Sequence, residues 1–396
     1  MNRSVVILRN VGHGVNDIFW YILPSLLPVI LDQFGMKYGT AGGLLTAFLG
    51  VVAVFSFILG KISDYFPRHI IIGAGFLVAS LFLIGGSLTN NFNLFVACLL
   101  VAGIGVGSYH AAGYALIEDI TENRKGRAYG MFEFWGAAGV LLMFLLHGLL
   151  LNHLSWRNII LITSIPGLAM GFLYFIYSER FRSAADRAKG KILNKTEIQD
   201  APVLLFILFI ISFTIRYFGI LGVVSFTSTY LVRELGLQAN VASYATGIYF
   251  LGGLIFTPFM GMQCDIRNPI LVLLFTTLIP FPLIFLMTLT QPLWVLPVYL
   301  LLIGGSYYGA GPAMSMIIAR MSSKLGKGEA FGYFMAVTSV TFSFSPLLFG
   351  MLADRIGLNL TMKIYSLPLL LGSVVLLVLF VVEKRYCLFE GTTTVR

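Results

Sequence analysis

Residues 13–35 read HGVNDIFWYILPSLLPVILDQFG, a run that is apolar at most positions. About 20 such residues in a helix cross the roughly 30 Å hydrocarbon core of a bilayer, so the run predicts a membrane-spanning helix. It is longer than the apolar region of a cleavable signal peptide and lacks a small-residue cleavage site. We therefore expect it to remain as the first span, although Asp17 places a carboxylate inside it.

The rest of the chain has the same character. Its 396 residues are 58% hydrophobic and 11% charged, whereas an average soluble domain has about 25% charged residues. Twelve runs are long and apolar enough to cross a membrane, at residues 8–31, 41–62, 70–89, 94–117, 128–150, 157–178, 203–230, 240–262, 269–289, 293–318, 329–351 and 362–382. The sequence therefore predicts an all-α membrane protein with twelve transmembrane helices.

The basic residues indicate the orientation of the chain. The net charge is +9, and most of the 26 Lys and Arg residues fall on segments that an inside amino terminus places in the cytoplasm. This is the positive-inside pattern of a cell (inner or plasma) membrane protein with both termini cytoplasmic, and not a nucleic-acid footprint. Cys98, Cys264 and Cys387 are too scattered to suggest a metal site or a disulfide framework, so we expect no metal and no cofactor.

The chain divides into two similar halves. The polar stretch SERFRSAADRAKGKILNKTEIQD, residues 178–200, separates the sixth span from the seventh. Three short segments before this stretch have similar counterparts after it, at nearly the same spacing along the chain. They are GKISD at 60–64 with GMQCD at 261–265, GSY at 107–109 with GSY at 305–307, and RAYGMF at 127–132 with EAFGYF at 329–334. We expect six-helix bundles at 1–178 and 202–396 joined by a cytoplasmic linker at 179–201. Such a duplication is typical of transporters whose halves rock around a site near the bilayer midplane.

The stretch GKISDYFPRH after the second span resembles the loop signature of the major facilitator superfamily. Gly60, Asp64 and Arg68 occupy its key positions, and Gly261 and Asp265 form a weaker second copy. The resemblance implies the two-bundle pseudo-symmetric fold of that superfamily and makes this motif a conformational latch, not a substrate site. A third look-alike, GMLADRIG at 350–357 after the eleventh span, is taken as coincidence.

Within that superfamily, three stretches are similar to the fosmidomycin-resistance type of exporter: GHGVNDIFWYILPSLLPVI, GVGSYHAAG and IRYFGILGVVSFTSTYL. They carry His13, Asp17, His110 and Arg216. The chain departs from the drug-proton antiporters of the superfamily, which usually have an arginine in the fourth span and a Gly-Pro signature in the fifth. These departures weaken the case for proton-driven drug antiport.

Asp17 is the leading candidate for a functional residue. It lies ~12 Å deeper than Arg9 at a rise of ~1.5 Å per residue, where an ionised carboxylate costs roughly 2.5 to 3.5 kcal/mol on insertion scales. It therefore needs water, a partner or a proton. Helical spacing places His13, Asp17 and Tyr21 on one polar face that should point inward.

The repeat suggests the partner, because Arg216 takes the equivalent position on the seventh span. We expect Asp17 and Arg216 to line the substrate path, either paired or holding an anionic group and a proton between them. A permanent salt bridge that only fixes the helices is the alternative. An arginine without such a partner would favour a carboxylate, phosphate or phosphonate on the solute.

Weaker candidates lie on other spans. His110 and Tyr114 share a face of the fourth span, Glu133 lies near the inner end of the fifth, and Tyr308 is near a predicted cavity face. A contact between Glu133 and the loop arginines explains that residue at least as well as a functional role does.

These features predict a secondary transporter and not an enzyme. We expect it to work as a monomer in the lipid bilayer by alternating access. It would export a small organic solute against a proton gradient, and this solute could carry a negative charge. Uptake of an organic anion by symport or exchange is the alternative. A transport-inactive receptor and a membrane-embedded enzyme are further rivals.

Overall fold

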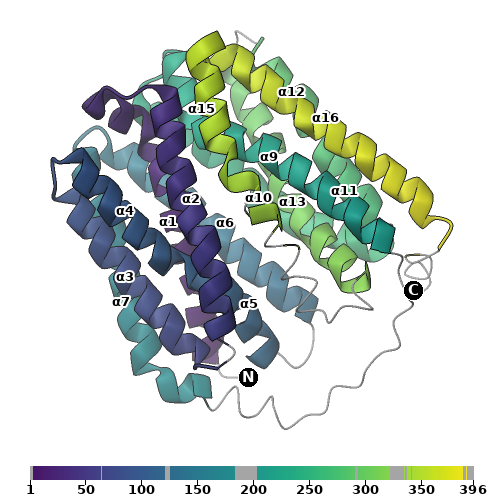
Figure 1. The fold of residues 1–396 in the computed structure, drawn as a ribbon, viewed down its shortest axis with the longest axis horizontal. Coiled ribbons are helices and arrows are strands. Elements are labelled where there is room, and N and C mark those ends of the chain that lie inside the picture. Colours follow the sequence, from purple (N-terminus) through teal and green to yellow (C-terminus); the bar gives the residue numbers. More distant parts are fainter. Residues whose placement is uncertain are drawn as a thin grey trace. The chain divides into compact units, whose positions relative to one another are not determined.

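The computed structural model describes residues 3–63, 65–120, 125–182, 203–289, 293–321, 334, 337–339, 341–386 and 389, except for the side chains of residues 118–129 and 319. These residues form helices and no strand (Figure 1). The helices of the first half are α1 (Arg3–Phe34), α2 (Tyr38–Ile62), α3 (Arg68–Ser87), α4 (Phe92–Gly107), α5 (Tyr109–Ile120), α6 (Lys125–Leu150) and α7 (Trp156–Ile176). Those of the second half are α9 (Val203–Arg233), α10 (Ala239–Ile266), α11 (Pro269–Leu278), α12 (Pro280–Met287), the short 3₁₀ helix η1 (Leu293–Val295), α13 (Leu296–Met321), α15 (Ser345–Ile356) and α16 (Leu358–Glu383).

The predicted number of spans is confirmed. Within the described ranges, 12 helical segments are long and apolar enough to cross a membrane. The first is longer than expected, at Arg3–Phe34, and the fourth, Phe92–Ile117, is built from α4 and α5 with a break at Ser108. The side-chain hydroxyl of Ser108 donates to the carbonyl of Gly105 at 2.7 Å, which satisfies one of the backbone acceptors at this break.

The chain forms two compact units. Unit 1 comprises Met1–Met36, Gly43–Asn194 and Leu231–Gly247, and unit 2 comprises Lys37–Gly42, Lys195–Tyr230 and Ile248–Arg396. The first turn of α2 thus belongs to unit 2, and the start of α10 to unit 1. The exact bundle boundaries expected from the sequence stay a prediction, and most of the expected linker lies outside the described residues.

In unit 1 the first helix is central. Within its most apolar window 78% of the residues are buried, against 33% for α2. Helix α1 packs on α6 and α7, while α3 packs on α4 and α7. Gly14 of α1 and Gly139 of α6 meet backbone to backbone, a contact that a Cβ at either position would prevent. The polar face of α1 is therefore enclosed by protein.

Unit 2 is built around a cluster of aromatic and aliphatic side chains on α9, α13 and α16. Phe209 and Phe213 of α9 stack or pack edge to face with Phe334, and Ile317 and Leu376 complete the same buried cluster. Helices α11 and α12 both pack between α13 and α16. Pro312 lies inside α13, where its ring removes one backbone hydrogen bond and favours a kink.

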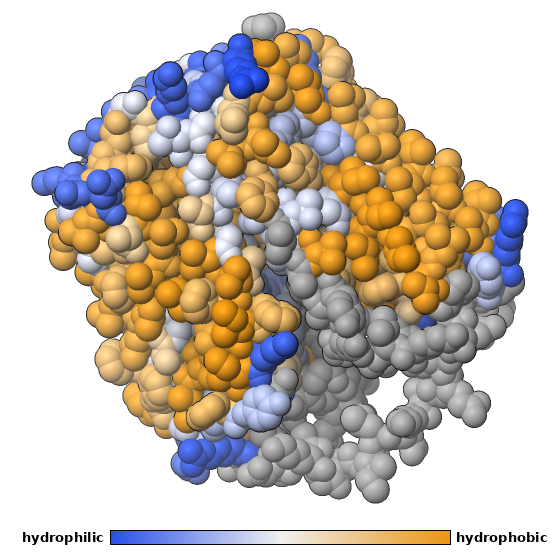
Figure 2. Space-filling view, in the orientation of Figure 1, coloured by the Kyte–Doolittle hydropathy of each residue, from blue (hydrophilic) through white to orange (hydrophobic). Residues whose placement is uncertain are grey.

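The outward faces of the helices carry large apolar side chains. Leu142, Phe172, Ile176, Leu371 and Val374 are each more than half exposed. Apolar residues cover much of the visible face and charged ones gather toward its ends (Figure 2). Exposed apolar surface on this scale suits contact with lipid and not with water.

Candidate functional site

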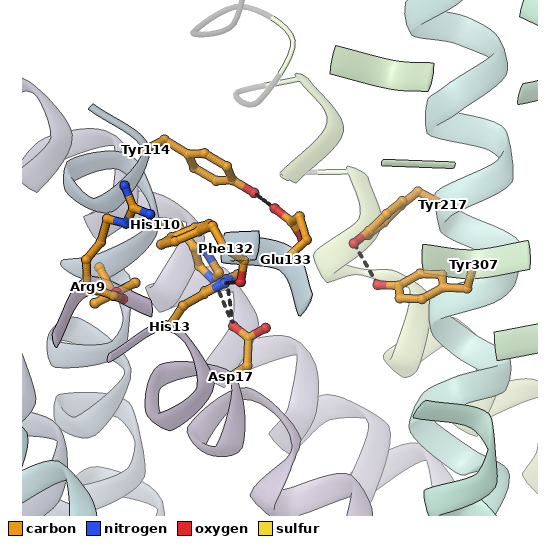
Figure 3. Close-up of polar contacts among 10 residues, drawn as sticks. Arg9, His13, Asp17, His110, Tyr114, Phe132, Glu133, Tyr217 and Tyr307 are labelled. Carbon is orange, nitrogen blue, oxygen red and sulfur yellow. Dashed lines mark hydrogen bonds and ion pairs between the residues drawn. The ribbon is translucent and has the colours of Figure 1, made fainter. Parts of the chain in front are cut away.

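A carboxylate and two histidines meet inside unit 1. One oxygen of Asp17, Oδ1, lies 3.5 Å from Nε2 of His13 and 3.4 Å from Nε2 of His110 (Figure 3). Asp17 and His13 are one helical turn apart on α1, whereas His110 comes from α5. His13 is 1% exposed, while the side chain of His110 is 25% exposed. His110 is therefore the most solvent-accessible of the three residues, which we call the Asp17–His13–His110 cluster.

The hydrogen bond on the far side of His13 determines what the cluster can do. Nδ1 of His13 lies 2.6 Å from the backbone carbonyl oxygen of Phe132. Because a carbonyl only accepts, Nδ1 carries a hydrogen, and Nε2 of the neutral ring is a bare acceptor. Nε2 faces Asp17 Oδ1, which is also an acceptor when ionised. The contact becomes attractive when a proton is held by Nε2 or by the carboxyl group, so the geometry provides a place for one proton.

The cluster is held rigidly against α6. The ring of His13 stacks on the ring of Phe132 with centroids 3.7 Å apart and planes 6° apart. A Cβ at Gly136 would lie 2.5 Å from Asp17 Oδ2 and 2.8 Å from His13 Cε1. Glycine is therefore required at position 136 for α6 to approach both side chains.

A second polar pair extends the cluster. The hydroxyl of Tyr114 donates to the carboxylate of Glu133, and the ring of Tyr114 lies near that of His110, with centroids 6.4 Å apart (Figure 3). The expected alternative for Glu133 was a contact with the loop arginines, whose side chains lie outside the described residues. The structure thus brings together five predicted site residues, Asp17, His13, His110, Tyr114 and Glu133.

The same cluster is the group of metal-ligating side chains found in the described part of the chain. The ligand atoms of His13, Asp17 and His110 all lie within 4.8 Å of one another. Two histidine nitrogens and one carboxylate oxygen are a donor set that suits zinc and similar ions. The spacing is thus compatible with a small cation as well as with a shared proton.

In unit 2, Arg216 of α9 is a buried charge. It is 1% exposed, and its Nη2 donates to the carbonyl oxygens of Ser306 and Tyr307 at 3.1 Å each. Its Nε and Nη1 are buried and have no hydrogen-bond partner among the residues that the structure describes. None of the ion pairs found among the described residues includes Arg216. Whether Arg216 also meets Asp17 of the other unit stays a prediction.

Tyrosines surround this guanidinium. Its carbon Cζ lies 5.8 Å from the ring centroid of Tyr307, and the hydroxyls of Tyr217 and Tyr307 are 2.7 Å apart (Figure 3). The ring centroid of Tyr249 is 5.8 Å from that of Tyr307.

The internal repeat explains why the two sites have similar layouts. Asp17 and Arg216 occupy equivalent positions on the first helix of each half. Asp17 contacts His110, which directly follows the first GSY segment, and Arg216 contacts two residues of the second GSY segment, Ser306 and Tyr307. In each unit, this charged residue of the first helix therefore has a contact in the middle of the fourth span.

The remaining predicted residues lie elsewhere. Tyr21 is partly buried one turn beyond Asp17 and is not among the partners of that carboxylate. Tyr308 packs against Phe250 and fills the space above Gly253, which is a packing role at the interface of α10 and α13.

The loop motif is only partly described. A Cβ at Gly60 would lie 2.9 Å from that of Ala111, so Gly60 allows α2 and α5 to approach closely, as the motif implies. Arg68 begins α3, and Asp64 lies outside the described residues. In the second copy, Gly261 has only Pro312 near it and Asp265 is exposed.

Sequence reasoning missed three polar contacts. Arg9, expected among the cytoplasmic basic residues, is buried and donates to Asn10. His147 bridges Ser25 of α1 and Thr163 of α7 at 2.7 and 3.0 Å. The Arg9 contact is between adjacent residues of α1, whereas the His147 contacts depend on which helices pack together, so no local pattern signals them.

The third missed contact involves the look-alike motif after the eleventh span. Within unit 2, the carboxylate of Asp354 accepts from the backbone N–H groups of Tyr38 and Gly39 at 2.9 and 2.8 Å. It therefore caps the amino terminus of α2, where a negative charge is favourable. The interpretation of GMLADRIG as a coincidence overlooked this contact.

A comparison of the sequence with models of protein families agrees with this architecture. The Major Facilitator Superfamily model matches residues 10–238 and 205–386, which together cover most of the chain. This chain belongs to the major facilitator superfamily. It is accordingly a membrane transporter of small molecules and not an enzyme, as expected.

Individual relatives are distant but extensive. The chain is 24% identical over 379 residues to the cis,cis-muconate transport protein of Acinetobacter baylyi, covering 92% of this chain and 91% of the relative. It is 21% identical over 240 residues to the fosmidomycin resistance protein of Escherichia coli, covering 59% and 58% of the two chains. The expected likeness to that type of major facilitator protein is thus confirmed.

A solved structure agrees on the fold. A bacterial homolog of the human lysosomal transporter Spinster, in an inward-facing and occupied conformation, superimposes with a TM-score of 0.76. The match has 14% sequence identity and covers 95% of this chain and 96% of that one. At this identity the likeness concerns the fold alone.

Proposed function

We propose that this major facilitator protein exports a small organic solute from the cell in exchange for protons, by alternating access. In this proposal it works as a monomer in the cell membrane, with both termini in the cytoplasm. The fosmidomycin resistance protein is a relative whose name fits export. The proposal extends that likeness to this chain.

The observation that carries the proposal is the tautomer of His13. Its Nδ1 donates to the carbonyl of Phe132, so its Nε2 faces the carboxylate of Asp17 with room for one proton between them. His110 is the partly exposed member of the cluster, through which a proton can enter or leave. A buried ionisable group of this kind in a transporter is typically part of a proton relay. Histidine is suited to the role because it changes charge near neutral pH.

A second candidate function is uptake of an organic anion together with a proton. The muconate transport protein, a relative over nearly the whole chain, favours this version. Arg216 also favours it, because a buried guanidinium without a carboxylate partner among the described residues suits a negatively charged solute.

Transport in liposomes under an imposed pH gradient tests the proposal. A panel including fosmidomycin and cis,cis-muconate would be assayed with the wild type and with Asp17→Asn, which keeps the size of the side chain and removes its proton. We expect the variant to lose acceleration by the gradient while retaining solute-for-solute exchange, which also shows that it is folded. Acceleration when protons and solute move in opposite directions supports export by exchange; acceleration when they move together supports the second candidate.

Two controls sharpen this assay. Asp32→Asn changes an exposed carboxylate on the same helix and should leave gradient dependence intact. A chelator such as EDTA should also have no effect, since protons and not metal ions are proposed to be carried. Gradient-driven flux that survives Asp17→Asn, or that is abolished by EDTA, would remove the cluster from proton coupling.

A further inference from the structure

The guanidinium group of Arg216 in unit 2 has more N–H donors than the described residues accept from. A guanidinium has three nitrogens and five N–H groups. Among the described residues, only Nη2 has protein acceptors, the carbonyls of Ser306 and Tyr307. In the same part of the chain, Nε and Nη1 are both buried and have no hydrogen-bond partner. An arginine that is 1% exposed is therefore left with much of its hydrogen-bonding capacity unsatisfied, which is costly in a buried environment.

A purely structural role accounts for only part of this arrangement. Ser306 and Tyr307 lie between one and two turns before Pro312 on α13, and a proline inside a helix favours a kink. Donation from Nη2 to these carbonyls would help to stabilise this part of α13. A neutral donor could do the same without the cost of burying a charge. The cation and its two open nitrogens need a further explanation.

A second buried donor lies in the same place. Tyr249 of α10 is 2% exposed, and its hydroxyl has no hydrogen-bond partner within the described part of the chain. Its ring lies 5.8 Å from that of Tyr307, which in turn lies 5.8 Å from Cζ of Arg216. Two side chains from different helices, each with unsatisfied buried donors, therefore converge in one region of unit 2.

A hydrogen-bonded pair of tyrosines, Tyr217 and Tyr307, lies beside this region. The ring centroid of Tyr307 is 5.8 Å from Cζ of Arg216 and 5.8 Å from the ring centroid of Tyr249. Tyr217 is partly exposed, whereas Arg216 and Tyr249 are buried.

We propose that Arg216 and Tyr249, beside the Tyr217–Tyr307 pair, form a binding site for the oxyanion group of a small organic solute. A carboxylate or a phosphonate supplies the negative charge and the acceptor oxygens that Nε, Nη1 and the Tyr249 hydroxyl lack. The inference rests on the proposed function in so far as the bound anion is the transported solute. It names the chemical class of that solute and leaves the direction of transport open.

Equilibrium binding to the purified full-length protein in detergent tests the site. The probes are cis,cis-muconate, its uncharged dimethyl ester, and methylphosphonate, each titrated by calorimetry. We expect at least one anion to bind and the ester not to bind. Muconate and methylphosphonate separate the two oxyanion sources, because whichever binds more tightly identifies the group that fits.

Two variants connect binding to the proposed residues. Tyr249→Phe removes one donor and should weaken anion binding about tenfold. Arg216→Gln removes the charge and should weaken it about a hundredfold. Tyr365→Phe is the matched control, because the hydroxyl of Tyr365 donates to the carbonyl of Ser345 and has no proposed part in binding.

Thermal unfolding without ligand separates a binding role from a structural one. Because the hydroxyl of Tyr249 has no protein partner, Tyr249→Phe should be at least as stable as the wild type, whereas Tyr365→Phe should be less stable. Anion affinity unchanged in Tyr249→Phe, ester binding equal to that of muconate, or no binding of either anion to the wild type would each overturn the inference. No pH gradient is needed, so this assay and the Asp17→Asn transport assay can fail independently.

Discussion

The close approach of α6 to the Asp17–His13–His110 cluster gives a prediction that leaves every titratable group in place. In Gly136→Ala, the new methyl group would lie 2.5 Å from Asp17 Oδ2, 2.8 Å from His13 Cε1 and 3.0 Å from His13 Nδ1. His13 cannot rotate away without losing its hydrogen bond to the Phe132 carbonyl and its ring stack. Helix α6 must therefore separate from α1, or the cluster must rearrange.

The magnitude follows by comparison with a second glycine of the same helix. Among the atoms that the structure describes, a Cβ at Gly130 meets nothing within 4 Å, so Gly130→Ala should show only the gain in helix propensity, about 1 kcal/mol. Gly136→Ala has the same gain but also an overpacking cost of about 1–3 kcal/mol. The difference in unfolding free energy between the two variants should therefore be about 1–3 kcal/mol.

Unfolding in detergent micelles measures this difference, and gradient-driven transport in liposomes measures its consequence. We expect Gly136→Ala to lose part of its dependence on the pH gradient, because the distance between His13 Nε2 and Asp17 Oδ1 changes, while Gly130→Ala behaves as the wild type. If the two alanine variants were equally stable and equally coupled, the packing of α6 against a proton site would be refuted.

Two further substitutions separate structural from functional polar groups. His147→Leu removes a fully buried ring that bridges two hydroxyls on α1 and α7. It should lower the unfolding free energy by about 1–3 kcal/mol and leave the dependence of transport on the pH gradient unchanged. Loss of proton coupling at unchanged stability would show that His147 has a functional and not a structural role. Asp354→Asn leaves one of the two carboxylate acceptors at the amino terminus of α2 and should lower the unfolding free energy by about 0.5–2 kcal/mol, measured by thermal unfolding. Asp265→Asn, at an exposed position, should change the stability little. Equal effects of the two substitutions would contradict the capping role of Asp354.

The sequence was sufficient for the spans, and it anticipated part of the site. Whether a segment can cross a bilayer depends on consecutive residues and the surrounding lipid, so the twelve spans follow from composition and length. The pairing of His13 with Asp17 is also local, because residues four apart share a helix face. The internal repeat further marked Arg216 as the counterpart of Asp17.

The partners from other helices required the tertiary structure. His110 reaches Asp17 from α5, and the tautomer of His13 is set by a carbonyl on α6. Arg216 is held by α13, and Asp354 caps a helix from the other end of the sequence. Such contacts depend on how helices rotate and approach one another, which small residues such as Gly136 permit and which no local pattern encodes. Whether a segment spans the membrane depends on the apolar character of its consecutive residues. Which buried charges meet a partner depends on how helices distant in the sequence pack together.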